Sequence, residues 1–353
     1  MQPNPLSQAL ECPAELAQVP KCVSHARHQK IESSKLKPKR NEQQGDNQMA
    51  GSLPTATLGR TKLEVTSLGF GAMEIRGAPR GRDVTPAQAE TILNAVLDAG
   101  INYIDTSIDY GLSEGFIGQF ISNRRDEYYL ASKCGCQLGA PTVPSGPQPH
   151  VFTKENIVAG IEQSLRRMKT DYLDVVQFHS SPSRQTLEDN GAIDTLRELQ
   201  QQGKIRHIGM SGTLPNLPGQ IDTGAFDVMQ IPYSALERQH ESWISKAAEA
   251  GIGTVIRGGV AKGEPGHSGV PRPDPWETFG QAGLDELLDE GESRTDFLLR
   301  FTLSHPGMHT TIVGTLNPDH LTQNAAAASK GPLPTSTYEE TKNRLKAAGE
   351  TPA

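Results

Sequence analysis

The stretch YIDTSIDYGLSE, residues 103–114, places a carboxylate and a phenol close together at the end of an apolar run. Asp105 ends that run and Tyr110 follows it, while Lys133 and His179 lie in or just after later apolar runs. An ammonium group beside a phenol favours the phenolate and lowers the phenol pKa, and a carboxylate keeps the ammonium charged. Asp105 and Lys133 would serve Tyr110 in this way. Tyr110 would then donate a proton to a substrate oxygen that gains negative charge, and His179 would orient that oxygen.

Proton donation to a carbonyl oxygen requires a second group that delivers hydride to the carbonyl carbon, which indicates a nicotinamide cofactor. No second acidic residue and no His–Cys cluster with ligand spacing accompanies these residues, so the sequence predicts no metal site. Cys134 and Cys136 follow Lys133 but lack the C-x-x-C spacing of a redox pair. As thiols near a lysine, they are predicted to be open to oxidation that inhibits the site.

These residues need a framework that brings the ends of separate apolar runs together. From about residue 55, short apolar runs alternate with longer amphipathic ones. The predicted strands cover residues 67–72, 102–107, 128–134, 173–179, 205–211, 227–234, 253–259 and 310–315. The predicted helices cover residues 85–100, 115–122, 153–170, 192–204, 240–251, 293–305, 317–329 and 337–349.

This alternation of strands and helices predicts the fold class α/β. About eight strand–helix repeats in roughly 280 residues favour a (β/α)8 TIM barrel over an open doubly wound sheet. The run GFGAMEI also lacks the glycine fingerprint of an open dinucleotide-binding sheet, because Ile75 occupies the last position. Residues 55–66 predict an N-terminal β-hairpin across the barrel floor that turns at Gly59 and Arg60. Residues 260–292 lack strong periodicity and are predicted to be an irregular insertion, with a lid favoured over padding.

The composition limits the classes of protein to consider. A net charge of -7 argues against nucleic-acid binding. No apolar run approaches the roughly 18 residues needed to span a bilayer. The four cysteines do not form a disulfide scaffold, and no signal peptide is visible, so a cytoplasmic location is expected. Residues 1–52 are predicted to be a disordered extension, with Met49 as a candidate true start. Residues 53–334 are predicted to form the barrel, and residues 335–353 a C-terminal helix and tail.

In a barrel of this kind the active site lies at the carboxyl ends of the strands, so Ser211 and Gln230 share a rim with the four residues above. The motifs IDTSIDYGLSE, ASK, DYLDVVQFHS and GKIRHIGMSG, and the opening LGRTKLEVTSLGFGAM, resemble the aldo-keto reductase family, bacterial-type branch. The resemblance covers roughly residues 55–330. It implies an oxidoreductase that acts on CH–OH groups with NAD(P) and reduces aldehydes or ketones. It also implies a catalytic tetrad of Asp105, Tyr110, Lys133 and His179, with Tyr110 the general acid.

The resemblance extends to the nicotinamide end of a cofactor site. It implies that Ser211 and Gln230 bind the carboxamide, although Gly212 stands where the family often has asparagine. Arg257 aligns with an aromatic residue that stacks on the nicotinamide ring in many members. A guanidinium can stack on a planar ring but repels an oxidised, positive one, so Arg257 is predicted to favour the reduced cofactor.

The motif IVGTLNPDHLTQN implies the adenosine end of the cofactor site. Thr315, His320, Gln323 and Asn324 occupy the family's adenosine-binding positions. Gly314 replaces a lysine and His320 an arginine, which removes positive charge that would meet a 2′-phosphate. NADP(H) is nevertheless favoured over NAD(H) on family grounds. Lys262 either reaches the pyrophosphate or is a solvated loop lysine.

Three further residues are candidates for the substrate pocket: Met73, Trp276 and Phe279, with Met73 equally compatible with the core. The expected substrate is a small-molecule carbonyl compound, and the sequence does not predict an oligomeric state. The main alternative is a cofactor-sensing regulatory or binding subunit on the same fold with little turnover, which an intact tetrad disfavours. A barrel lyase or isomerase is a third alternative, since IRGGVAKG offers some of the glycines of a phosphate-binding loop.

Overall fold

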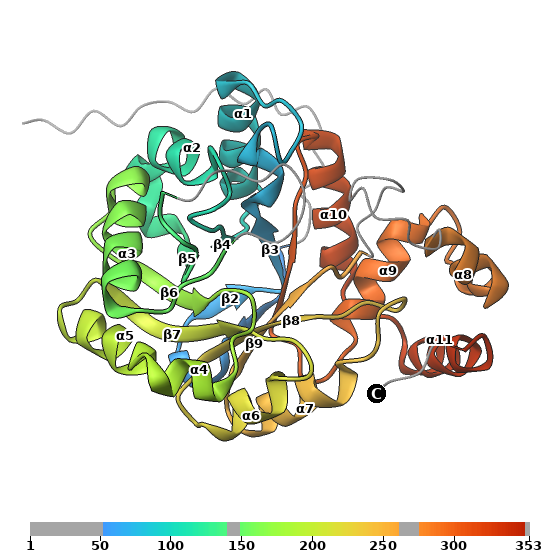
Figure 1. Ribbon diagram of the computed structural model, residues 1–353. Helices are drawn as coiled ribbons and strands as arrows, with labels where there is room; N and C mark the ends of the chain where they lie inside the picture. The colour runs from blue at the N-terminus through green and yellow to red at the C-terminus, as the bar shows by residue number, and fades with distance from the viewer. Residues whose placement is uncertain (1–51, 140–148, 261–274, 350–353) are drawn as a thin grey trace, which may run out of the picture. The chain divides into compact units, whose positions relative to one another are not determined.

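The computed structural model describes residues 52–139, 149–260 and 275–349. They form a closed barrel of eight parallel strands in the order β10-β3-β4-β5-β6-β7-β8-β9 (Figure 1). The strands are β3 Leu68–Gly71, β4 Tyr103–Asp105, β5 Tyr129–Cys134, β6 Leu173–Phe178, β7 Ile205–Ser211, β8 Val228–Pro232, β9 Gly253–Arg257 and β10 Thr310–Val313. The predicted TIM barrel is confirmed, and the carboxyl ends of all eight strands meet at one rim.

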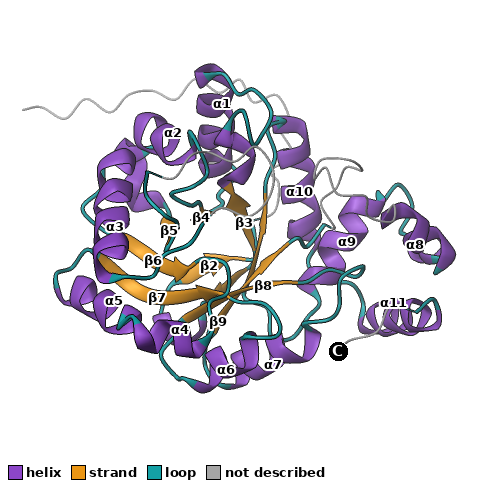
Figure 2. Cartoon of the chain, viewed as in Figure 1, coloured by secondary structure: helices purple, strands orange, loops and turns teal. Residues whose placement is uncertain are grey.

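The helices surround the strands (Figure 2). They are α1 Pro86–Asp98, α2 Ser113–Phe120, α3 Lys154–Met168, α4 Arg184–Asp189, α5 Ala192–Gln201, α6 Leu217–Asp222, α7 Glu241–Glu249, α8 Pro275–Gln281, α9 Arg294–Leu303, α10 Pro318–Lys330 and α11 Thr335–Ala347. Within the described residues, every helix is too short or too polar to cross a lipid bilayer.

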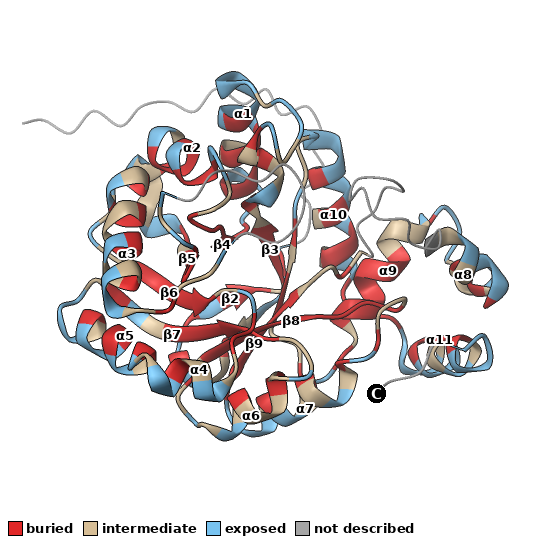
Figure 3. Cartoon of the chain, viewed as in Figure 1, coloured by how far each residue is buried: buried red, intermediate tan, exposed pale blue. Residues whose placement is uncertain are grey.

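The barrel strands are largely buried (Figure 3), and the buried side chains form two clusters, as expected for a barrel whose strands are covered on both faces. The outer layer lies between strands and helices; α1 contributes Ile92, Leu93 and Val96, which recur at helical spacing and are fully buried. A capping box formed by Thr85 and Gln88 begins this helix. The inner layer includes Val175, Val228 and Val255 inside the barrel.

An antiparallel hairpin of β1 Thr55–Thr57 and β2 Glu64–Thr66 closes the barrel floor. Leu58 and Val65 of this hairpin pack against the inner layer, and the Arg60 amide donates to the Gly251 carbonyl at 2.9 Å. The predicted hairpin is therefore confirmed, with a short 3-10 helix, Gly59–Thr61, as its turn.

Three connections contain helices that the sequence did not predict, and the one after β6 holds α4. Residues 275–292, the described part of the predicted irregular insertion, hold α8 and a 3-10 helix, Leu284–Leu287. The Pro- and Gly-rich connection after β7 holds α6, with a proline in its first turn. Proline is favoured at that position, because its missing N–H would have no helical partner there. The predicted extension, apart from Ser52, lies outside the described residues.

Candidate active site

Asp105 and Lys133 form a buried ion pair inside the carboxyl rim of the barrel. The Lys133 Nζ atom lies 2.5 Å from Asp105 Oδ1 and donates to the Thr106 carbonyl at 2.8 Å. Gln177, on β6, donates to the other carboxylate oxygen of Asp105 at 2.7 Å. Both oxygens of the buried carboxylate therefore have partners, which is what a buried charge requires. The sequence analysis gave Gln177 no role, because an amide within an apolar strand carries no signal for its partner.

A tight turn after β4 holds Tyr110 above this pair. The Tyr110 amide donates to the Ser107 carbonyl at 3.0 Å, and the Ser113 amide donates to the Tyr110 carbonyl at 2.8 Å. The next residue, Gly111, has a φ of 43°, and a Cβ there would lie 2.3 Å from the Arg76 carbonyl oxygen. Only glycine meets both constraints. The Lys133 ammonium lies 5.0 Å from the centre of the Tyr110 ring.

Burial changes the pKa expected for the Tyr110 phenol. Burial raises the pKa of the Tyr110 phenol, and the charge of Lys133 opposes that increase only in part. Lys133 therefore acts in the predicted direction, but the predicted net lowering of the Tyr110 pKa is wrong. Burial also works against the charge of Lys133, but Asp105, Tyr110 and Asp109 together outweigh it and raise the pKa of Lys133. The resting site thus holds a protonated phenol beside an ammonium group.

His179 follows β6 and faces the phenol. Its ring centre lies 6.2 Å from that of Tyr110 in an edge-to-face arrangement, and its amide donates to the Cys134 carbonyl at 3.1 Å. Ser180 and Ser181 follow with φ values of 62° and 50°, which are uncommon for residues other than glycine. Burial lowers the pKa of His179 to about 3, with Lys133 adding to the effect and Asp109 opposing it. The imidazole is therefore neutral at physiological pH.

Asp109, to which the sequence analysis gave no role, lies beside His179. Its Oδ1 atom is 3.7 Å from His179 Nδ1 and accepts from the Ser107 hydroxyl at 2.5 Å. Its Oδ2 atom accepts from Arg80 Nη1 at 3.2 Å. Burial alone would raise the pKa of Asp109, but His179, Ser107 and Arg80 together lower it. An ionised carboxylate therefore lies against the histidine ring.

The residues predicted to hold the nicotinamide end lie together on neighbouring strands. Ser211 and Gln230 are register partners on β7 and β8, and both are buried. The Gln230 Nε2 atom is buried without a hydrogen-bond partner. A buried amide nitrogen with no partner fits a ligand that brings an acceptor, as a carboxamide oxygen would. Arg257 ends β9 on the same rim and, among the described residues, makes no ion pair.

The residues predicted to hold the adenosine end lie where β10 leads into α10. Gly314 and Thr315 precede the helix, and His320 and Gln323 lie exposed in its first turns, with Asn324 buried. A Cβ at Gly314 would lie 2.5 Å from the Gly71 carbonyl oxygen, so this backbone has no room for a lysine there. Lys262 lies outside the described residues.

The three candidates for the substrate pocket do not lie together. Met73 is 38% exposed in the 3-10 helix Ala72–Arg76, at the rim. Phe279, on α8, is fully buried with its ring 5.9 Å from that of Phe297 on α9. Trp276 packs 6.0 Å from Phe279, and α8 lies outside α9 and away from the barrel strands (Figure 1). Phe279 therefore has no free surface for a substrate in this structure.

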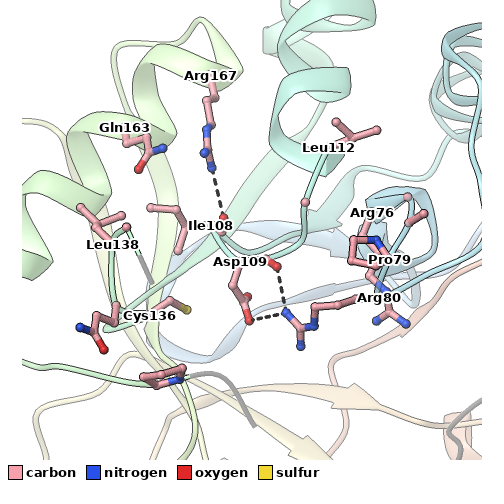
Figure 4. A pocket seen from close by; sticks show the side chains of 16 residues that line it. Arg76, Pro79, Arg80, Ile108, Asp109, Leu112, Cys136, Leu138, Gln163 and Arg167 are labelled. Carbon is pink, nitrogen blue, oxygen red and sulfur yellow. Dashed lines mark hydrogen bonds and ion pairs between the residues drawn. The ribbon is translucent and has the colours of Figure 1, made fainter. Parts of the chain in front are cut away.

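The structure has a pocket of about 390 Å³ next to the neighbours of His179 (Figure 4). Asp109 and Cys136 form part of its wall and also contact His179. Three arginines, Arg76, Arg80 and Arg167, line it together with apolar side chains, and the Arg76 Nε atom is buried without a hydrogen-bond partner. Arg80 is paired with Asp109 and Arg167 with Glu114, so Arg76 is the arginine here with an unpartnered donor for a polar or anionic part of a ligand.

Neither rim cysteine has the character of a reactive thiolate. Burial raises the pKa of Cys134 well above its usual value and that of Cys136 to about 12. Both are free thiols in the structure, and both are buried. The predicted susceptibility to oxidation has no support in this geometry, because the thiolate is the reactive form.

Comparisons with known proteins agree with the geometry. A model described as "Aldo/keto reductase family" matches residues 67–345. The chain is 30% identical to the oxidoreductase YqkF of Bacillus subtilis over 291 residues, which cover 77% of this chain and 90% of YqkF. It is 26% identical to L-galactose dehydrogenase of Arabidopsis thaliana, over 77% of this chain and 87% of that protein. Among solved structures, the holo form of aldo-keto reductase AKR11C1 from Bacillus halodurans has a TM-score of 0.71 at 28% identity, covering 84% of this chain and 96% of that one.

Proposed function

The chain belongs to the aldo/keto reductase family, and on this premise we propose that it reduces aldehyde or ketone carbonyls to alcohols with a nicotinamide cofactor. The observation that carries the proposal is the convergence of Asp105, Lys133 and Tyr110 with His179 at one rim. A regulatory subunit on the same fold is not favoured, because nothing in sensing a cofactor requires a protonated phenol aligned with a buried ammonium group.

The cofactor, when bound, supplies hydride to the carbonyl carbon. Tyr110 donates its phenolic proton to the carbonyl oxygen, and its raised pKa keeps that proton in place until the oxygen gains charge. Lys133 stabilises the phenolate that remains after the transfer, and Asp105 with Gln177 fixes Lys133. These roles are the catalytic part of the proposal.

His179 orients the carbonyl oxygen through one ring nitrogen. Its Nδ1 atom lies 3.2 Å from Cys136 Sγ, and Cys136 is a thiol at neutral pH. We assign the S–H as donor to Nδ1, which leaves the ring proton on Nε2. Nε2–H then donates a hydrogen bond to the substrate oxygen. Cys136 is thus a positioning residue for the histidine.

We assign NADP(H) as the expected cofactor in preference to NAD(H), and the cytoplasm as the expected location. Ser211 and Gln230 would hold the nicotinamide carboxamide, and the residues at the start of α10 would hold the adenosine half. Backbone N–H groups at that helix end can bind phosphate without the missing lysine. NADPH and NADH titrations monitored by cofactor fluorescence compare the two affinities; tighter binding of NADH would reverse the assignment.

The test of the function is cofactor consumption with a panel of aldehydes and ketones in the presence of NADPH or NADH. The panel includes aldoses, because L-galactose dehydrogenase is among the relatives. It also includes carbonyl compounds with an anionic group, because of the arginines in the pocket. The proposal fails if no compound is reduced faster by the wild type than by Tyr110→Phe.

Arg257 is expected to make the protein prefer the reduced cofactor. Two unit charges about 4 Å apart near a protein surface interact by about 4 kcal/mol, so partial repulsion of an oxidised nicotinamide is worth about tenfold in affinity. We expect Arg257→Tyr to tighten NADP⁺ binding about tenfold relative to NADPH, measured by fluorescence or calorimetric titration. Arg257→Lys, which keeps the charge, is the control. An unchanged ratio of the two affinities in Arg257→Tyr would refute the role.

The reductive rate is expected to be level between about pH 5 and pH 9, because the pKa of His179 is shifted below its usual value and that of Tyr110 above its usual value. His179 has a pKa lowered to about 3, so it gains a proton only far below its usual range as the pH falls. Tyr110 has a raised pKa, so it loses its proton only above its usual range as the pH rises. The pH profile of kcat/KM reports the pKa values of these groups in the free enzyme. An acid limb near pH 6.5 would contradict the neutral His179.

A further inference from the structure

Three potential metal ligands, one of them His179, converge at the rim. Cys136 Sγ and the ring nitrogens of His150 and His179 all lie within 4.8 Å of one another. Cys136 Sγ is 3.2 Å from His179 Nδ1 and 3.7 Å from His150 Nε2. Zinc bonds of about 2.3 Å to sulfur and about 2.0–2.1 Å to nitrogen, at tetrahedral angles, place such ligands about 3.6 Å apart. The two distances from Cys136, 3.2 Å and 3.7 Å, are close to that spacing.

The backbone holds these ligands in place. Cys136 and His150 oppose each other in an isolated antiparallel bridge, flanked by hydrogen bonds from Gln137 to Pro149 at 2.9 Å and from Val151 to Gly135 at 2.7 Å. Asn156 donates to the Cys136 and Val151 carbonyls and ties the two segments together. The chain therefore presents the two side chains toward His179 as a fixed arrangement, and little ordering is needed on binding.

The surroundings of the ligands also suit a cation. The Ser180 hydroxyl lies 3.2 Å from His150 Nδ1 and 3.1 Å from His150 Nε2, so it is a hydrogen-bond partner that can orient the ring. Asp109 Oδ1 lies 3.7 Å from His179 Nδ1 and adds negative charge. One thiol and two imidazoles form a ligand set suited to Zn²⁺, with a fourth position left for water.

We propose that Cys136, His150 and His179 bind Zn²⁺ and that the bound ion competes with the carbonyl substrate. Binding forms one Zn–S and two Zn–N bonds and releases the thiol proton of Cys136 to solvent. Because Cys136 and Asp109 line the 390 Å³ pocket, an ion between Cys136 and His179 takes space beside the tetrad. The competition with substrate rests on the proposed reductase function, whereas the binding itself does not.

The binding is tested with Co²⁺ as a spectroscopic probe. The full chain carries Cys12→Ser and Cys22→Ser, so that the thiols before residue 52 do not contribute. We expect one equivalent of Co²⁺ to give a thiolate charge-transfer band and the intense visible bands of tetrahedral coordination, and Zn²⁺ to displace it. Cys136→Ser should lose the charge-transfer band. His150→Asn removes a ligand itself, so it should weaken Co²⁺ affinity by more than the about 10–100-fold that results when only a ligand's hydrogen-bond partner is removed.

The matched control is Cys134→Ser, which removes a buried thiol two positions away that lies outside the cluster. It should keep both the band and the affinity. Equal Co²⁺ spectra for Cys136→Ser and Cys134→Ser, or only the weak bands of octahedral cobalt in the wild type, would overturn the site. Circular dichroism of each variant identifies loss of fold, and the half-buried His150 gives a second variant if Cys136→Ser does not fold.

The functional consequence has its own readout. Zn²⁺ should raise KM for the carbonyl substrate without changing kcat, and this increase, relative to each variant's own zinc-free KM, should disappear in Cys136→Ser. A fall in kcat alone would overturn the competition. If the wild type reduces no carbonyl compound, the proposed function fails while the cobalt spectra still decide the metal site.

Discussion

Replacement of Tyr110 by phenylalanine is expected to lower kcat for carbonyl reduction by about 10²–10⁴-fold, the usual range for loss of a general acid. The substitution removes one hydroxyl group and leaves the ring in its position above Lys133. Because the proton is transferred only in the transition state, kcat and kcat/KM should fall together. The cofactor affinity should change little.

The fold of Tyr110→Phe should remain intact, since the Tyr110 hydroxyl makes no hydrogen bond within the described residues. Tyr103→Phe is the matched control. Tyr103 lies on β4, its hydroxyl is buried without a partner, and its ring packs in the inner layer with Val175 and Val255. Steady-state kinetics of both variants separate the two roles. A Tyr110→Phe enzyme that keeps more than about a tenth of the wild-type kcat would refute Tyr110 as the acid.

The positions of Asp105, Lys133 and His179 could be predicted because the fold imposes them. Once eight strands alternate with helices, the end of each strand falls at one rim, and a polar residue at that end is within reach of the others. Ser211 and Gln230 follow from the same rule, and they turn out to be register partners. The rule depends on strand ends alone, which apolar runs mark well.

Residues outside strand ends could not be placed in the same way. Asp109 and His150 lie in loops, and their contacts with His179 depend on a turn at Gly111 and on a bridge between Cys136 and His150. Neither feature follows from periodicity. This is also why no metal site was expected from spacing: Cys136, His150 and His179 are far apart in the sequence and meet only through the loops.

The direction of the Tyr110 pKa shift is a second feature that could not be predicted from the sequence. The sequence identifies Lys133 as a neighbour, and that neighbour does lower the pKa. It does not show how thoroughly the surrounding loops remove water from the phenol, and this desolvation is the larger effect. A similar limit applies to Phe279, whose position in a long insertion suggested a lid, whereas the helix around it packs into the core against Phe297.

Replacement of Lys133 by methionine is expected to damage both catalysis and stability. Catalysis should fall about as far as in Tyr110→Phe, because the phenolate left by proton transfer loses its neighbouring charge. The variant also leaves the Asp105 carboxylate buried with Gln177 as its remaining side-chain partner. Removing one member of a buried ion pair typically destabilises a protein by about 3–5 kcal/mol. Urea unfolding and steady-state kinetics measure the two effects separately.

The double variant Asp105→Asn/Lys133→Met distinguishes the two effects of Lys133. It removes both charges while keeping an acceptor for Gln177, so most of the stability should return. Activity should not return, because no charge remains to stabilise the phenolate. Lys154→Met, at an exposed ion pair with Glu198, is the control for losing a lysine and should change stability by less than about 1 kcal/mol. A double variant that is stable and fully active would show that Lys133 only balances the charge of Asp105, and the proposed mechanism would then lose its central interaction.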